Sequence, residues 1–232
     1  LHEITFGKNI SSIGYGAFKN CLELNKITID IVQGKKNCLN SILLDEFQEV
    51  DVTIRYMDES GNVQDVSRLV FTDYQYEYVP EIEARQFNWE TYGSGDSYRI
   101  SIKDTGIDYD KYDSVFSLAQ VEDEDSTLLK IAAYRLCWPY KLTLDSRERY
   151  ETYIKNHMTG ILGTLIRGSG TDDIQPLFDY MLNHRLLTPK DVETALDLCS
   201  RYGKASMTAQ LMDYQGISRP KGQEGIRSRF TL

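Results

Sequence analysis

Histidine, cysteine and clustered carboxylates are the residues of this chain that could bind a metal ion or catalyse a reaction. The three histidines, His2, His157 and His184, lack the close spacing with other nitrogen or sulfur ligands that zinc requires. A pair of Cys199 and His184 could act as nucleophile and base if the fold brought the two side chains together. The chain contains neither a Gly-x-Ser-x-Gly elbow nor a phosphate-binding P-loop. The sequence therefore predicts no catalytic residue, no metal ligand and no cofactor.

The four cysteines share no Cys-x-x-Cys spacing, and their neighbours are mostly apolar. This pattern favours buried free thiols over a metal site or a disulfide framework. They are Cys21, Cys38, Cys137 and Cys199.

The acidic string at residues 108–113 invites comparison with a calcium-binding loop. Such a loop needs an oxygen ligand at its fifth position, glycine at the sixth and glutamate at the twelfth. Those positions hold Tyr112, Asp113 and Ala119, so we expect no calcium site. A second acidic run, at residues 122–125, directly precedes a helical pattern. Negative charge is favourable at a helix N-terminus, so this run is expected to cap the helix.

Aromatic side chains among carboxylates, between residues 74 and 92, are the candidates for binding another protein. Tyrosine and tryptophan supply rigid contact area at protein interfaces. The same side chains could instead cover a small core, and the sequence leaves both interpretations open. The candidate protein-binding residues are Tyr74, Tyr76, Tyr78, Trp89 and Tyr92.

The composition is that of an ordinary globular chain, with an uneven distribution of charge. Of the 232 residues, 41% are hydrophobic and 26% are charged, and the net charge is −9. Residues 45–125 hold 21 of the 35 acidic side chains but only 6 of the 26 basic ones. Such a region repels phosphate backbones, so nucleic acid is not an expected partner.

The sequence contains no run of about 18 apolar residues, so no membrane span is expected. The chain opens on leucine rather than methionine, and we expect its natural N-terminus to lie further upstream. The compartment is therefore left open between the cell surface or exterior and the cytoplasm.

The first residues match themselves when shifted by 23 positions. A period in the twenties with apolar residues at fixed offsets is typical of leucine-rich repeats, in which each coil contributes one short strand. The matching pairs are Leu1 and Leu24, Ile4 and Ile27, and Phe6 and Ile29.

The strings IGYGAFKNC and LELNKITI, which occupy residues 13–29, resemble the BspA-like leucine-rich repeats of gut and oral bacteria. The resemblance implies surface display and binding to proteins or other ligands. A further coil would place apolar residues at 33 and 36 and an aromatic residue at 41. The sequence has Gln33, Lys36 and Ser41 there, so the pattern ends. Because about one and a half repeats cannot form a stable solenoid alone, we expect either more repeats upstream or support from the residues that follow.

The middle of the chain predicts antiparallel strands. Residues 49–57 alternate apolar and polar side chains, residues 58–62 form a turn in which Gly61 is free to take a positive φ, and residues 63–72 return. The pair predicts a β-hairpin. A third strand is expected at residues 97–103, with one side formed by Tyr98, Ile100 and Ile102.

The second half predicts helices. One covers residues 126–137 and ends at Trp138, because the residue before proline is pushed out of helical geometry. One or two more are expected between residues 144 and 167. Pro189 suits a first helical turn, with Thr188 as its cap.

A weaker repeat, with a shift of 33, aligns Leu165 with Leu198 and Phe178 with Leu211. Residues 193–204 resemble the helix-turn-helix of an ankyrin repeat, although residues 183–188 replace the usual hairpin. As a whole, the chain looks like bacterial proteins of uncharacterised function that join BspA-like repeats to a helical, ankyrin-like region. This resemblance implies no activity.

The sequence thus predicts an α+β chain in four regions. They are the end of a leucine-rich repeat array (1–44), a small acidic antiparallel β region (45–115), an α-helical ankyrin-like region (116–216) and a flexible tail (217–232). We expect a non-enzymatic module that binds another protein; neither the partner nor the oligomeric state can be named. The alternatives are a hydrolase with a non-local carboxylate site in the acidic middle and a structural end-cap of a longer surface protein. A deep pocket gathering titratable groups would favour the enzyme, and a shallow face lined by tyrosine would favour binding.

Overall fold

The chain has a mixed α+β fold divided into two compact units, Leu1–Tyr153 and Ile154–Leu232. The structure is a computed structural model that describes residues 1–43, 46–80, 87–168 and 172–218. For residues 76–80, 87–91 and 217–218 it describes the backbone alone. The division between the units falls inside a helix, so the first unit contains the repeat segment, the acidic middle and the first helices.

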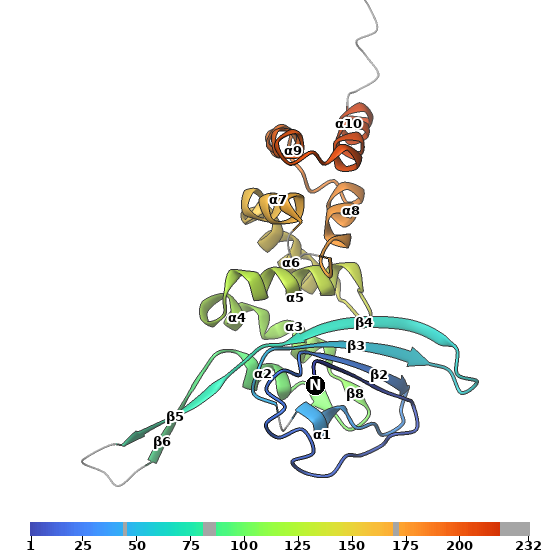
Figure 1. Cartoon of the computed structure of the whole chain (residues 1–232), viewed down its shortest axis with the longest axis vertical. Helices are drawn as coiled ribbons and strands as arrows, with labels where there is room; N and C mark the ends of the chain where they lie inside the picture. The colour runs from blue at the N-terminus through green and yellow to red at the C-terminus, as the bar shows by residue number, and fades with distance from the viewer. Residues whose placement is uncertain (44–45, 81–86, 169–171, 219–232) are drawn as a thin grey trace, which may run out of the picture. The chain divides into compact units, whose positions relative to one another are not determined.

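A four-stranded sheet forms the centre of the first unit (Figure 1). Its strands, in spatial order, are β1 (Glu3–Phe6), β2 (Lys26–Val32), β3 (Val50–Met57) and β4 (Val63–Phe71). β1 and β2 are parallel, and Ile4 lies opposite Ile27. This register has the same 23-residue shift that the sequence displays.

The parallel ladder continues one strand beyond the end of the sequence pattern. Gln33 and Lys36 are exposed, and the short helix α1 (Leu39–Leu43) follows them. β3 then pairs in parallel with β2, with Ile27 opposite Val52, a shift of 25 residues. Three paired residues from each of β2 and β3 are buried in the same core; they are Ile27, Ile29, Ile31, Val52, Ile54 and Tyr56.

β3 and β4 form the predicted hairpin. Gly61 takes a φ of +94° in the turn, as expected. The Asp58 carboxylate accepts the backbone N–H of Asn62 at 2.8 Å and closes the turn. The ladder is irregular at Tyr56 and Met57, a β-bulge that makes Gln64 the extra residue of β4.

The third strand predicted at residues 97–103 is wrong. A second hairpin, β5 (Gln75–Pro80) with β6 (Phe87–Tyr92), extends away from the sheet in Figure 1 and leads into the short helix α2 (Gly95–Arg99). Only β7 (Ile102–Lys103) is extended, paired with β8 (Gly106–Ile107).

Tertiary contacts of Arg99 account for the helical turn at α2. Its buried guanidinium donates hydrogen bonds to the carbonyl oxygens of Thr72, Gly95, Gln48 and Leu43. Because the oxygen of Gly95 lies one helical turn before Arg99, a helix satisfies this side chain and an extended strand would not. The alternation of Tyr98, Ile100 and Ile102 was therefore misleading.

Four helices complete the first unit, the last of them crossing into the second. They are α3 (Tyr109–Ser114), α4 (Phe116–Glu122), α5 (Asp125–Cys137) and α6 (Leu144–Asn156). α5 packs along β4 and ends at Trp138, as predicted. The capping expectation for the acidic run holds in part. Asp125 lies in the first turn of α5, but the Glu124 side chain makes no cap bond and Asp123 bonds to Ser94.

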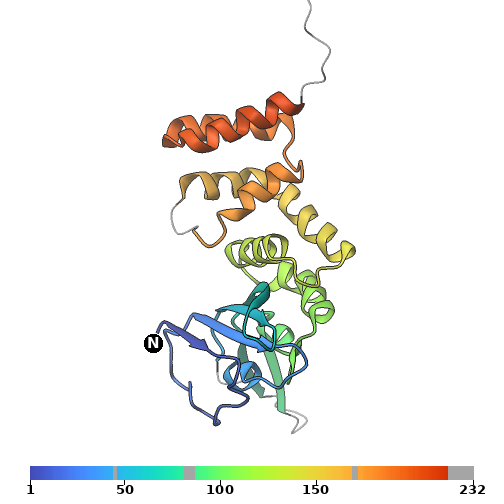
Figure 2. The same ribbon diagram turned by 90° about the vertical axis from the view of Figure 1, so that its right-hand side faces the viewer.

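The second unit is made of helices. α7 (Met158–Arg167), α8 (Pro176–Asn183), α9 (Pro189–Tyr202) and α10 (Ala205–Ser218) lie in successive layers, with α9 and α10 stacked on α7 and α8 (Figure 2). Thr188 and Asp191 form a capping box in front of Pro189, which confirms the predicted helix start. Among the described helices, none is long and apolar enough to cross a membrane.

Candidate functional site

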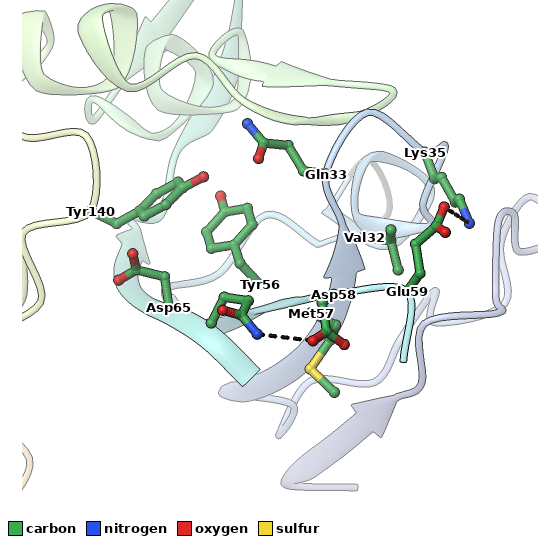
Figure 3. A pocket seen from close by; sticks show the side chains of 10 residues that line it. Val32, Gln33, Lys35, Tyr56, Met57, Asp58, Glu59, Asp65 and Tyr140 are labelled. Atoms are coloured by element: carbon green, nitrogen blue, oxygen red, sulfur yellow. Dashed lines mark hydrogen bonds and ion pairs between the residues drawn. The ribbon is translucent and has the colours of Figure 1, made fainter. Parts of the chain in front are cut away.

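A groove of about 440 Å³ lies in the first unit, between the end of β2, the tip of the β3–β4 hairpin and the turn after α5 (Figure 3). We call it the tyrosine groove. Its volume falls within the roughly 300–1,000 Å³ typical of small binding sites. A second hollow of about 260 Å³ shares Gln33, Tyr56 and Tyr140 with it and continues toward Lys103 and Lys141.

Tyr56 forms the floor of the tyrosine groove. The ladder places it beside Ile31 of β2 and opposite Asp65 of β4. Its ring is nearly buried, and its hydroxyl shares a hydrogen bond of 2.7 Å with the hydroxyl of Tyr109. Burial, with the neighbouring Tyr109 second, raises the pKa of Tyr56 far above that of a free tyrosine. Tyr56 is therefore neutral near pH 7 and is not a base.

The ring of Tyr140 packs over the ring of Tyr56. The two rings are stacked, with centroids 4.0 Å apart and an angle of 21° between their planes. Tyr140 belongs to a tight turn after α5, in which Leu142 N–H bonds to the carbonyl of Pro139 and Lys141 takes a φ of +51°. Burial, and after it the Asp65 carboxylate, raises the pKa of Tyr140. The stack leaves one aromatic platform at the surface of the groove.

A buried ion pair holds this turn in place. The Arg135 guanidinium donates to both carboxylate oxygens of Asp113, at 2.7 and 2.9 Å, and neither side chain is exposed. It also donates to the carbonyl oxygen of Tyr140 at 3.2 Å. The Tyr150 hydroxyl adds a third hydrogen bond to Asp113 at 2.8 Å. Burial alone would lower the pKa of Arg135, but the hydrogen bond and charge of Asp113 reverse the effect and raise it.

The charged side chains at the hairpin tip are largely satisfied by their neighbours. Asp58 accepts hydrogen bonds from Asn62 and from the Gln64 amide, and the Asn62 bonds chiefly lower its pKa. Lys35 forms an ion pair with Glu59 at 3.7 Å. Figure 3 shows one hydrogen bond to the Asp58 carboxylate in the lower wall of the groove and the ion pair of Lys35 with Glu59 in the right-hand wall. These groups shape the groove, and Lys35 and Glu59 remain exposed to solvent.

A second polar cluster lies under α5, where a carboxylate site in the acidic middle would be expected. Glu49 accepts from Lys130 and Thr127, each at 2.6 Å. Asp51 accepts from Lys130 at 3.2 Å and from Tyr134 at 3.0 Å. Burial raises the pKa of Asp51, against the opposing effect of Lys130. All four oxygens have donors, so the cluster fastens α5 to β3 and presents no open carboxylate.

The histidines and cysteines lie outside the groove. His184 stacks on Tyr180 and its Nδ1 contacts the carbonyl oxygen of that residue at 3.0 Å. Cys199 is buried on α9, and burial raises the pKa of its thiol, the opposite of what an activated nucleophile needs. Among the residues that the structure describes, no three His, Cys, Asp or Glu side chains gather as they would around a metal ion.

Of the predicted protein-binding aromatics, Tyr74 and Tyr92 do not line the tyrosine groove. Tyr74 is buried, with the Arg99 guanidinium 4.8 Å from its ring centre, so it belongs to the core at the base of the β5–β6 hairpin. Tyr92 is 51% exposed at the end of β6. The side chains of Tyr76, Tyr78 and Trp89 are outside the described residues, although the backbone pairs Tyr78 with Trp89.

Sequence reasoning missed the groove because its residues come from distant segments. Tyr56 falls within the strand predicted at residues 49–57, and Tyr140 lies beyond the predicted helix end at Trp138, where no element is predicted. The available signal was local. Trp138, Pro139, Tyr140 and Lys141 form an aromatic-rich turn directly after a helix, and surface loops of this kind often carry function.

No protein-family model matches the chain, and comparison with curated proteins and with solved structures finds no match either.

Proposed function

We propose that the chain is a non-enzymatic module that binds another protein, and that the tyrosine groove is its binding site. The observation that carries the proposal is the chemistry of the groove wall. It combines a stacked pair of tyrosines with the amides of Gln33 and Gln64, and its charged groups are mostly paired internally. Aromatic rings with polar groups around them are typical of protein contact surfaces.

The protonation states in the groove argue against a hydrolase. A general acid or base works best with a pKa near the working pH. The pKa of Tyr56 is raised far above neutral and that of Asp58 is lowered. Neither group changes charge near pH 7, so the groove offers fixed charges and flat apolar surfaces.

We further propose that the N-terminal strands are coils of a BspA-like leucine-rich repeat and that the second unit consists of ankyrin-like helical pairs. The parallel β1–β2 register with its 23-residue shift supports the first part. The alternation of α7 to α10 in two layers supports the second. The resemblance to BspA-like repeats makes display at the bacterial surface the expected setting.

A structural end-cap is the second candidate function. The parallel ladder is followed by the antiparallel strand β4, and α5 packs along that strand. Such an arrangement covers an edge on which a repeat stack would otherwise continue. Removing residues 126–232 from the chain tests this role. Unchanged solubility and melting of the N-terminal strands would argue against it.

Site-specific photo-cross-linking tests the binding role. A benzophenone side chain replaces Gln33 or Gln64 in the full chain, and Glu148, exposed on α6, is the control position. We expect a discrete protein adduct from the groove positions, suppressed by excess unmodified chain and confirmed with the purified partner. Identical adducts from Glu148, or turnover in a panel of ester, glycoside and phosphate substrates, would refute the proposal.

A further inference from the structure

The tyrosine groove contains one carboxylate that the fold leaves available. Asp65 is exposed and forms no ion pair within the described part of the chain, whereas Asp58 and Glu59 are engaged by the turn and by Lys35. Figure 3 shows the Asp65 carboxylate beside the Tyr140 ring. The Asp65 charge also contributes to the raised pKa of Tyr140, which indicates that the two groups interact.

A carboxylate beside a tyrosine ring is a site for a planar cation. The interior of the protein contains such a site with its cation in place. The Arg135 guanidinium bonds to Asp113 and lies 4.8 Å from the centre of the Tyr109 ring. Arginine stacks on aromatic faces and pairs with carboxylates, so the two contacts reinforce each other. The groove presents the same carboxylate and ring without the guanidinium.

We propose that the tyrosine groove binds an arginine side chain of a basic segment in the partner protein, with the guanidinium over Tyr140 and paired with Asp65. This inference rests on the proposed function and names the partner's chemistry. The charge of the groove agrees with it, because its lining residues include three carboxylates, Asp58, Glu59 and Asp65, and one ammonium, Lys35. A partner segment with positive charge is attracted to this region, and an acidic segment is repelled.

Lys141 is an internal competitor for the same ring. Its ammonium lies over Tyr140, 5.4 Å from the ring centre, near the outer limit of about 6 Å for such contacts. Lys141 is exposed, so an incoming guanidinium can displace its side chain. Removing the lysine should therefore strengthen binding, a result that a site for acidic ligands would not give.

The test uses the full chain and a pentapeptide blocked at both ends that carries two arginines, with a matched glutamate peptide as the negative control. Calorimetry or fluorescence anisotropy measures the dissociation constant. We expect Asp65→Asn to weaken arginine-peptide binding by about two- to fivefold, as for an exposed ion pair. Glu122→Gln, which removes an exposed charge from α4 outside the groove, should leave it unchanged.

Substitutions of Tyr140 and of Lys141 complete the test. Tyr140→Leu should weaken binding by about two- to fivefold, as for an exposed cation–π contact, and Tyr140→Phe should preserve it. If Tyr140→Leu fails to fold, the Asp65→Asn and Lys141→Ala results decide the question. Lys141→Ala should tighten binding.

Equal binding of the glutamate peptide, no binding of the arginine peptide, or no effect of Asp65→Asn would each overturn the inference. These results are separable from the proposed function. A cross-linked partner at Gln33 together with failure of the arginine peptide would retain the binding module and reject the arginine site.

Discussion

The buried pair of Arg135 and Asp113 should be the most sensitive point of the first unit. Asp113→Ala leaves the Arg135 guanidinium without its counter-charge and without two hydrogen bonds. It also deprives the Tyr150 hydroxyl of its acceptor. Breaking a fully buried ion pair by removing one partner costs about 3–5 kcal/mol. For a unit of this size, such a loss lowers the melting temperature by roughly 6–20 °C.

Tryptophan fluorescence in a urea titration measures the effect on this unit alone. The chain has 2 tryptophans, Trp89 and Trp138, and both belong to the first unit. We expect the midpoint to fall sharply for Asp113→Ala. Combining Asp113→Leu with Arg135→Met should cost less than the sum of the two single variants, because no buried charge is left alone.

The pair also supports the tyrosine groove. Arg135 donates to the carbonyl oxygen of Tyr140, so its loss should loosen the turn that carries the platform. A cost below about 1 kcal/mol for Asp113→Ala, within the range of an exposed pair, would refute this reasoning. Strict additivity of the two single substitutions would refute the claim that the residues act together.

Three further predictions concern separate parts of the chain. Burial raises the pKa of Asp123 above the ordinary 3.8, so the folded state binds its proton more tightly than the unfolded state. The contribution of Asp123 to the stability of the first unit should therefore fall as pH rises from 3.8 through that raised pKa, and urea titrations at several pH values should show that Asp123→Asn removes this contribution. Thr188→Ala removes the capping box of α9 and should cost about 1 kcal/mol, whereas exposed Ser200→Ala should cost almost nothing; hydrogen exchange of the second unit separates the two. Gly95→Ala would press a methyl group against the carbonyl oxygens of Thr72 and Asp73 and should cost about 1–3 kcal/mol in thermal melts. Equal melting of Gly95→Ala and Gly7→Ala, which meets no atom within 4 Å, would contradict the argument.

Local signals predicted the elements that the structure bears out. The β3–β4 hairpin follows from alternation and from Gly61, α5 from its apolar face and Trp138, and the start of α9 from Thr188. In each case neighbouring residues carry the information. The failures depended on distant partners. Arg99 imposes a helical turn through carbonyl oxygens of three separate segments, and no period in residues 97–103 could reveal it.

The parallel pairing of β3 with β2 also depends on residues that are distant in the sequence. The repeat pattern ends at Gln33, yet the predicted strand β3 still pairs with β2. The shift between paired residues is 25 instead of 23, and the short helix α1 lies between the two strands. Which strands pair in parallel depends on the burial of whole strand faces, and these are formed by residues distant in the sequence. Sequence periodicity shows which side chains share a face, but it does not show which strand lies next to that strand.

Strand register therefore encodes the tyrosine groove, and no motif does. The parallel ladder sets Tyr56 beside Ile31, and the antiparallel ladder sets Asp65 opposite Tyr56. A slip of one residue in the β2–β3 ladder would turn Tyr56 to the other face of the sheet and separate it from Tyr140, and a slip in the β3–β4 ladder would separate Asp65 from Tyr56. The buried Ile and Val side chains of β2 and β3 oppose such a slip, because it would expose them to water. The core that specifies the register thus also specifies the groove, which forms where the parallel ladder gives way to the bulged hairpin.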